Sequence, residues 1–96
     1  MYKYKDEILD KSIAAELIIE LFQGNQKVRR GTIGDRVEQT HIDGGGLPHN
    51  NSQWAVTLAL DGLKALRLAN NPVRGEWSFL SIDDMIARFE SLLDTN

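Results

Sequence analysis

One continuous run, Leu58 to Ser81, reads as an amphipathic helix that passes without a spacer into a tight β-hairpin. The apolar residues of its first half recur at the three- and four-residue spacing that places them on one helical face: Leu58, Ala59, Leu63 and Leu66. Asp61 and Lys64 fall elsewhere on the same helix. The pattern therefore predicts a helix with one buried face.

The hairpin is predicted from the turn formers that follow this helix. Pro72 has a fixed φ suited to a type I turn after Asn71, and Gly75 can adopt the left-handed conformation that restores the register. Trp77 and Phe79 alternate with polar residues, as in a strand with one apolar face. We expect residues near Leu66–Ala69 to pair with Trp77–Leu80, with Leu66 and Leu68 supplying the matching apolar face and Arg74 exposed at the tip.

This run resembles a known family, the winged-helix domain at the N-terminus of Mrr-type restriction endonucleases and of some stand-alone bacterial proteins. The family shows an apolar WA…LKK…GL segment, then PRRG, an aromatic and a hydroxyl residue. The matching positions are Leu58-Ala59, Leu63-Lys64, Leu68, Pro72, Arg74-Gly75, Trp77, Phe79 and Ser81. Leu58 replaces the family's Trp, and Arg67 replaces the Gly that ends its recognition helix. The resemblance implies a winged helix-turn-helix fold that reads DNA.

Composition limits the size and setting of the protein. With 96 residues, 42% of them hydrophobic, the chain is expected to form one domain over residues 1–96 with a single core. It has no cysteine, so disulfides and thiolate zinc sites are excluded. Its N-terminus is charged, and no run approaches the roughly 20 apolar residues of a membrane span. We expect a soluble, cytoplasmic protein.

Helix boundaries can be assigned from capping residues. Asp6 or Asp10 starts a first helix that ends near Gly24, and the hydroxyl of Thr32 caps a second helix that stops at Gly44–Gly46. Asn51 or Ser52 caps the third helix, and Ser81 caps the last. The fold class is then mainly α with a small β-hairpin, in the order α-α-α-β-β-α. The segment NQKVRRG, the most basic point of the chain, is expected to connect the first two helices.

No group of residues supports catalysis or a cofactor. His41, Asp43 and His49 could supply metal ligands, but their spacing crosses a triple glycine that does not preorganise them, so we expect no metal. Gly44–Gly46 lacks the Lys-Ser or Lys-Thr of a phosphate loop and is predicted to be a flexible connector. Three hydroxyl residues stand at predicted helix starts, where capping explains them: Thr32, Ser52 and Ser81. The protein is not expected to be an enzyme.

The first functional hypothesis is a small bacterial DNA-binding protein, either a homodimeric transcriptional regulator or an accessory factor. Amide and hydroxyl groups at the start of the third helix suit base edges, and basic side chains suit phosphates. The residues predicted to contact DNA are Lys27, Arg29, Arg30, Arg36, Asn50, Asn51, Ser52, Gln53, Lys64, Arg67 and Arg74. The balance of 11 basic to 14 acidic residues opposes this hypothesis, because duplex affinity depends on neutralised phosphates.

The alternative is a non-catalytic winged-helix module without DNA binding. Such a module would bind a protein or a small ligand through an apolar surface near Trp54, Trp77 and the glycine loop.

Self-association is expected under either hypothesis. The first helix is apolar on several sides, and the last helix carries an apolar stripe beyond the hairpin. We therefore expect a homodimer whose interface includes Ile18, Phe22, Ile82, Ile86, Phe89 and Leu93.

Overall fold

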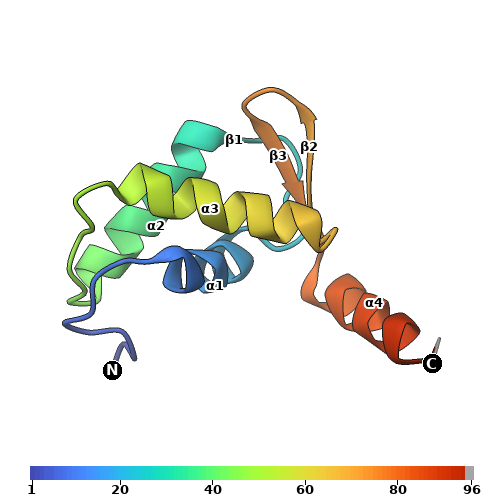
Figure 1. Ribbon diagram of the computed structural model, residues 1–96, viewed down its shortest axis with the longest axis horizontal. Coiled ribbons are helices and arrows are strands. Elements are labelled where there is room, and N and C mark those ends of the chain that lie inside the picture. Colours follow the sequence, from blue (N-terminus) through green and yellow to red (C-terminus); the bar gives the residue numbers. More distant parts are fainter. Residues whose placement is uncertain (95–96) are drawn as a thin grey trace.

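The computed structural model describes residues 1–94 and shows a mainly helical chain with a small antiparallel sheet (Figure 1). The elements are α1 (Lys11–Phe22), β1 (Val28–Arg29), α2 (Arg30–Asp43), α3 (Ser52–Ala65), β2 (Ala69–Val73), β3 (Glu76–Phe79) and α4 (Ile82–Asp94). The predicted succession of three helices, a hairpin and a last helix is confirmed. The strand β1 is not among the predicted elements and lies within the segment predicted to connect the first two helices.

The core lies between α1, α2, α3 and the inner face of the hairpin. Its largest fully buried side chains include Phe22, Phe79, Leu9, Ile18, Ile33 and Leu60. The rings of Phe22 and Phe79 stack with centroids 5.9 Å apart, which joins α1 to β3. Ile18 and Phe22 are therefore buried in the core of their own chain. Their prediction as dimer-interface residues is wrong, because neither is accessible to a second copy. A helix that is apolar on several sides is here buried against several elements of the same chain.

The sheet has the strand order β1-β3-β2, with β3 in the centre. β1 pairs with β3 through Val28↔Trp77 and Arg29↔Glu76, and β2 pairs with β3 through Ala69↔Phe79. The predicted pairing of Leu66–Ala69 with Trp77–Leu80 is confirmed only at its end, where Ala69 pairs with Phe79 and Leu80 N donates to Leu68 O at 3.2 Å. Leu66 instead caps the end of α3, and the strand begins at Ala69. Pro72 lies inside β2 instead of in the turn, which an edge strand tolerates. The turn is Arg74–Gly75, with Gly75 at φ 80° and Arg74 exposed at the tip as predicted.

Within residues 1–94, three of the four helices begin at a side-chain cap. The carboxylate of Asp10 accepts from Ile13 N at 2.9 Å, the amide oxygen of Asn51 accepts from Trp54 N at 3.0 Å, and Ser81 Oγ accepts from Asp84 N at 3.1 Å. α2 differs, because it begins at Arg30 without any side-chain cap. The prediction of a Thr32 cap is therefore wrong.

The glycine loop after α2 is packed, contrary to the predicted flexible connector. Gly46 is buried, and a Cβ there would lie 2.3 Å from the ring of His41. His41 is itself fully buried, with Nε2 2.7 Å from the carbonyl oxygen of Glu7 and Nδ1 2.7 Å from the Tyr2 hydroxyl. Because the carbonyl only accepts, Nε2 carries the proton and Nδ1 accepts from Tyr2. These two hydrogen bonds of His41 attach the N-terminal segment to the end of α2.

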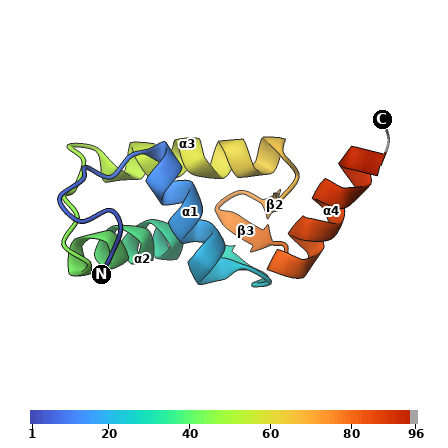
Figure 2. The same ribbon diagram turned by 90° about the horizontal axis from the view of Figure 1, so that it is seen from below.

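α4 leaves the base of the hairpin and stands at one end of the molecule, apart from α1, α2 and α3 (Figures 1 and 2). Its first turn is anchored by the buried Met85 and by a bond from Ile82 N to Gln23 Oε1 at 2.8 Å. Among the described residues, none of the helices has the length and apolar character needed to cross a membrane.

Candidate nucleic-acid interface

Arg30 joins three elements on one side of the molecule. Its backbone N–H donates to the carbonyl oxygen of Gly75 in the hairpin turn at 2.8 Å. Its guanidinium donates to Gln53 Oε1 at 3.1 Å, to the Gln53 carbonyl at 2.9 Å and to Thr57 Oγ1 at 2.9 Å. The start of α2, the Arg74–Gly75 turn and the first half of α3 therefore form one continuous surface, the Arg30 face.

The exposed side of α3 within this face is polar and partly ordered. Gln53 and Thr57 are exposed and stand four residues apart, so their side chains lie on the same side of the helix. Arg30 holds both of them in a defined position. Amide and hydroxyl groups held in this way can donate to and accept from a flat polar ligand such as a base edge.

Trp54 adds an apolar element beside Gln53. Its side chain is 50% exposed, and its ring stacks on His49 with centroids 5.6 Å apart. The apolar surface predicted near Trp54, Trp77 and the glycine loop is not formed as expected, because Trp77 is only 7% exposed and belongs to the core.

The guanidinium of Arg30 forms hydrogen bonds within the protein, to residues of α3. Burial lowers the pKa of Arg30 below its ordinary value and the nearby Asp61 carboxylate opposes that shift, but an arginine stays charged in either case. Because three of its five N–H donors are engaged by α3, Arg30 positions Gln53 and Thr57 instead of serving mainly as a phosphate contact.

Free positive charge near the Arg30 face comes from other residues. Lys27, Arg29 and Arg74 are exposed, with Arg29 on β1 next to Arg30 and Arg74 in the hairpin turn. The first turn of α2 has no carboxylate and no side-chain cap, so its N–H groups beyond Arg30 have no capping side chain. A helix start with these neighbours suits an anion, such as a backbone phosphate.

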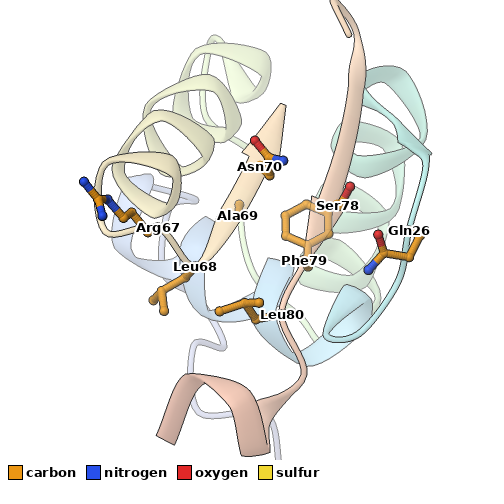
Figure 3. A pocket seen from close by; sticks show the side chains of 8 residues that line it. All are labelled: Gln26, Arg67, Leu68, Ala69, Asn70, Ser78, Phe79 and Leu80. Atoms are coloured by element: carbon orange, nitrogen blue, oxygen red, sulfur yellow. The ribbon is translucent and has the colours of Figure 1, made fainter. Parts of the chain in front are cut away.

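Several predicted contact residues lie elsewhere. The guanidinium carbon of Arg36 sits 5.0 Å from the centre of the Phe22 ring, on the side of α2 that faces α1. Lys64 belongs to the last turn of α3, and Arg67 follows that helix at the base of the hairpin. The 14-residue helix spans about 20 Å, so Lys64 and Arg67 are far from its start. Figure 3 shows Arg67 pointing away from the strands.

The four residues around the start of α3 divide into two groups. Asn50 and Gln53 are exposed, and Gln53 keeps its amide N–H groups for a ligand while its Oε1 accepts from Arg30. Asn51 is exposed but is used as the helix cap, and Ser52 is 8% exposed and donates to the His49 carbonyl at 3.3 Å. The prediction of Ser52 as a contact residue is therefore corrected.

The base of the hairpin holds a separate hollow of about 210 Å³. Gln26, Asn70 and Ser78 supply its polar groups, while Leu68, Phe79 and Leu80 supply apolar lining (Figure 3). It lies at the opposite end of the strands from the Arg74–Gly75 turn and is not part of the Arg30 face.

No cluster of three or more His, Asp or Glu side chains that could hold a metal occurs in residues 1–94. His41 uses both ring nitrogens in hydrogen bonds to Tyr2 and Glu7, and His49 Nδ1 accepts from Asn51 N at 2.8 Å. The three predicted metal-ligand candidates are thus not brought together.

No family model, curated protein or solved structure matches this chain.

Proposed function

We propose that this chain is a winged-helix protein that binds double-stranded DNA through the Arg30 face, as a small bacterial regulator or accessory factor. In this proposal α3 enters the major groove, and Gln53 and Thr57 meet base edges. The Arg74–Gly75 hairpin turn is the wing and contacts the adjacent backbone. The N-terminus of α2 lies against a backbone phosphate, which its free N–H groups and the positive charge of Arg29 bind.

One observation carries the proposal. Arg30 binds the turn of the hairpin through its backbone and the exposed side of α3 through its guanidinium. A hairpin and a helix that must contact one duplex together need a fixed relative position, and Arg30 supplies it. A side chain ordered before binding also loses less conformational entropy when it meets a base.

The acidity of the chain favours a second candidate function. The net charge is −3, and Asp61 stands on α3 one turn after Thr57. Like charge beside phosphates weakens binding, so the same face with its half-exposed Trp54 could instead serve a protein partner.

Binding to duplex DNA separates the two candidates. We expect fluorescence anisotropy with labelled duplexes of random sequence to show binding at about 50 mM salt that weakens steeply at higher salt, because released counterions drive phosphate contacts. Absence of binding at that low salt concentration would contradict the DNA proposal and leave the protein-binding candidate. A selection from a random duplex library then identifies the preferred sequence.

A further inference from the structure

α4 carries an apolar face that no described residue of the chain covers. Its uncovered side chains are Ile82, Ile86, Phe89 and Leu93, which are 41%, 49%, 53% and 72% exposed. Their spacing of four, three and four residues puts them on one side of the helix. Met85, on another side of the helix, is 7% exposed and packs against its own chain.

A second uncovered apolar surface lies between α1 and α3. This α1–α3 groove is a hollow of about 310 Å³ lined by Lys11, Ser12, Ala15, Leu58, Ala59, Gly62, Leu63 and Leu66. Several of these side chains are small, so a helix could approach closely. Leu66 is 60% exposed and also lines a small gap beside Phe89, so the groove and the apolar face of α4 are continuous.

Gly62 leaves the groove open on the side of α3. A Cβ at Gly62 would meet no described atom within 4 Å, so the space beside this position is empty. A glycine, which has no Cβ, allows the backbone of another helix to approach closely there.

The α4 helix of the same chain does not fill the groove, since none of its residues lines it. Only Leu80 and Ser81 separate β3 from α4. This link is held at the C-terminal end of α1, where Leu80 O accepts from Gly24 N at 3.0 Å and Gln23 Oε1 accepts from Ile82 N at 2.8 Å. The groove residues of α1 lie in its first two turns, at the other end of a helix about 18 Å long.

We propose that the occupant is a second copy of this chain, with α4 of each copy filling the α1–α3 groove of the other. A reciprocal exchange of this kind is a closed two-fold interface, which uses one self-complementary surface. It covers both uncovered apolar surfaces at once. The inference is independent of the proposed DNA function, because it concerns a different face.

Charge supports the groove as the partner of α4. Asp83 and Glu90 are exposed and seven residues apart, so they flank the apolar face of α4 on the same side. Lys11 stands exposed at the groove and can pair with this acidic flank. Two α4 helices packed antiparallel on each other would instead bring Asp83 of one copy near Glu90 of the other, and like charges oppose such pairing.

Sedimentation velocity on the full chain tests the proposal. We expect wild-type protein to be dimeric at tens of micromolar, and Phe89→Glu and Gly62→Arg each to be monomeric. Ser91→Glu, which adds the same charge on another exposed side of α4, and Gly31→Arg, where a Cβ meets nothing within 4 Å, should stay dimeric. Circular dichroism checks that each variant keeps its helices, and Ile86→Lys repeats the α4 test at a second site.

Mixing the two monomeric variants gives the sharper readout. The intact α4 of the Gly62→Arg chain can enter the intact groove of the Phe89→Glu chain, so heterodimers should form, more weakly than the wild-type dimer because one of two contacts is restored. A monomeric wild type would overturn the proposal. So would a dimer that is lost in Phe89→Glu but kept in Gly62→Arg, or a mixture that stays monomeric, since either result would mean that α4 does not occupy the groove.

Discussion

Arg30 and Gln53 are joined by two hydrogen bonds, from the guanidinium to the side-chain oxygen at 3.1 Å and to the carbonyl oxygen at 2.9 Å. A third bond reaches Thr57 one turn later at 2.9 Å. The planar guanidinium serves these three acceptors from two nitrogens held at a fixed separation, which a single ammonium nitrogen does not reproduce. The relationship makes Arg30 a positioning residue for the exposed side of α3.

This arrangement predicts the behaviour of Arg30→Lys. The variant keeps the charge but cannot reproduce the three bonds, so sequence preference in the library selection should fall while the salt dependence of duplex binding stays unchanged. Gln53→Ala should have the same effect. The two substitutions should be non-additive in urea unfolding, with a coupling of about 0.5–3 kcal/mol expected for residues in direct contact. Additive effects would show that Arg30 does not act through Gln53.

Arg74 is expected to contact phosphate without reading sequence. Arg74→Ala should weaken binding to all duplexes alike and should reduce the slope of log affinity against log salt by about 1. Arg36→Ala is the matched control, because Arg36 packs on the Phe22 ring away from the Arg30 face. Equal losses in the two variants would point to net charge alone and not to a hairpin contact.

Arg67 holds a backbone conformation that disfavours its side chain. Its φ is 60°, in the left-handed region that costs a residue with a Cβ about 1–2 kcal/mol. Arg67→Gly should therefore stabilise the protein by about 1 kcal/mol, or about 4–8 °C in Tm for a domain of this size. Thermal unfolding followed by circular dichroism measures the shift. Leu66→Gly, at φ −81° in the same turn, should lower Tm instead.

Gly46 is expected to tolerate no side chain. A Cβ at this position would lie 2.3 Å from a His41 ring that is bonded through both nitrogens and cannot move aside cheaply. Gly46→Ala should lower the free energy of unfolding, measured in urea, by about 1–3 kcal/mol, as overpacking of a core does. Gly31→Ala is the control, because that helical position is open. This substitution should raise the free energy of unfolding by up to about 1 kcal/mol. Similar values for the two variants would argue against a packed glycine loop.

Alkaline pH should loosen the N-terminal segment through Tyr2. Burial raises the pKa of the Tyr2 hydroxyl, and the nearby Tyr4, Glu16, Glu20 and Glu7 add to this shift. The unfolded chain then loses this proton first, so stability is full below the ordinary tyrosine pKa of about 10 and falls as the pH rises above it. Urea midpoints measured above and below about pH 10 should show this fall, and Tyr2→Phe should reduce it. Parallel profiles for wild type and variant would contradict this role of Tyr2.

Local sequence determined the parts of this protein that depend on neighbouring residues. Asp10, Asn51 and Ser81 start helices because a short polar side chain reaches the N–H three residues on, and nothing distant is needed. The exposed turn at Arg74–Gly75 is likewise a local consequence of a glycine that can adopt positive φ.

Tertiary structure decided the rest. β1 is two residues long and is a strand because it pairs with β3. A strand of this length has no sequence pattern of its own, so the local sequence does not predict it. Arg36 and Arg30 look equivalent in sequence, yet packing turns one toward Phe22 and the other toward α3. The apolar residues of α1 and α4 also look alike in sequence. The neighbours of α1 bury Ile18 and Phe22, while the two-residue link after β3 holds α4 away from the body and leaves Phe89 and Leu93 exposed.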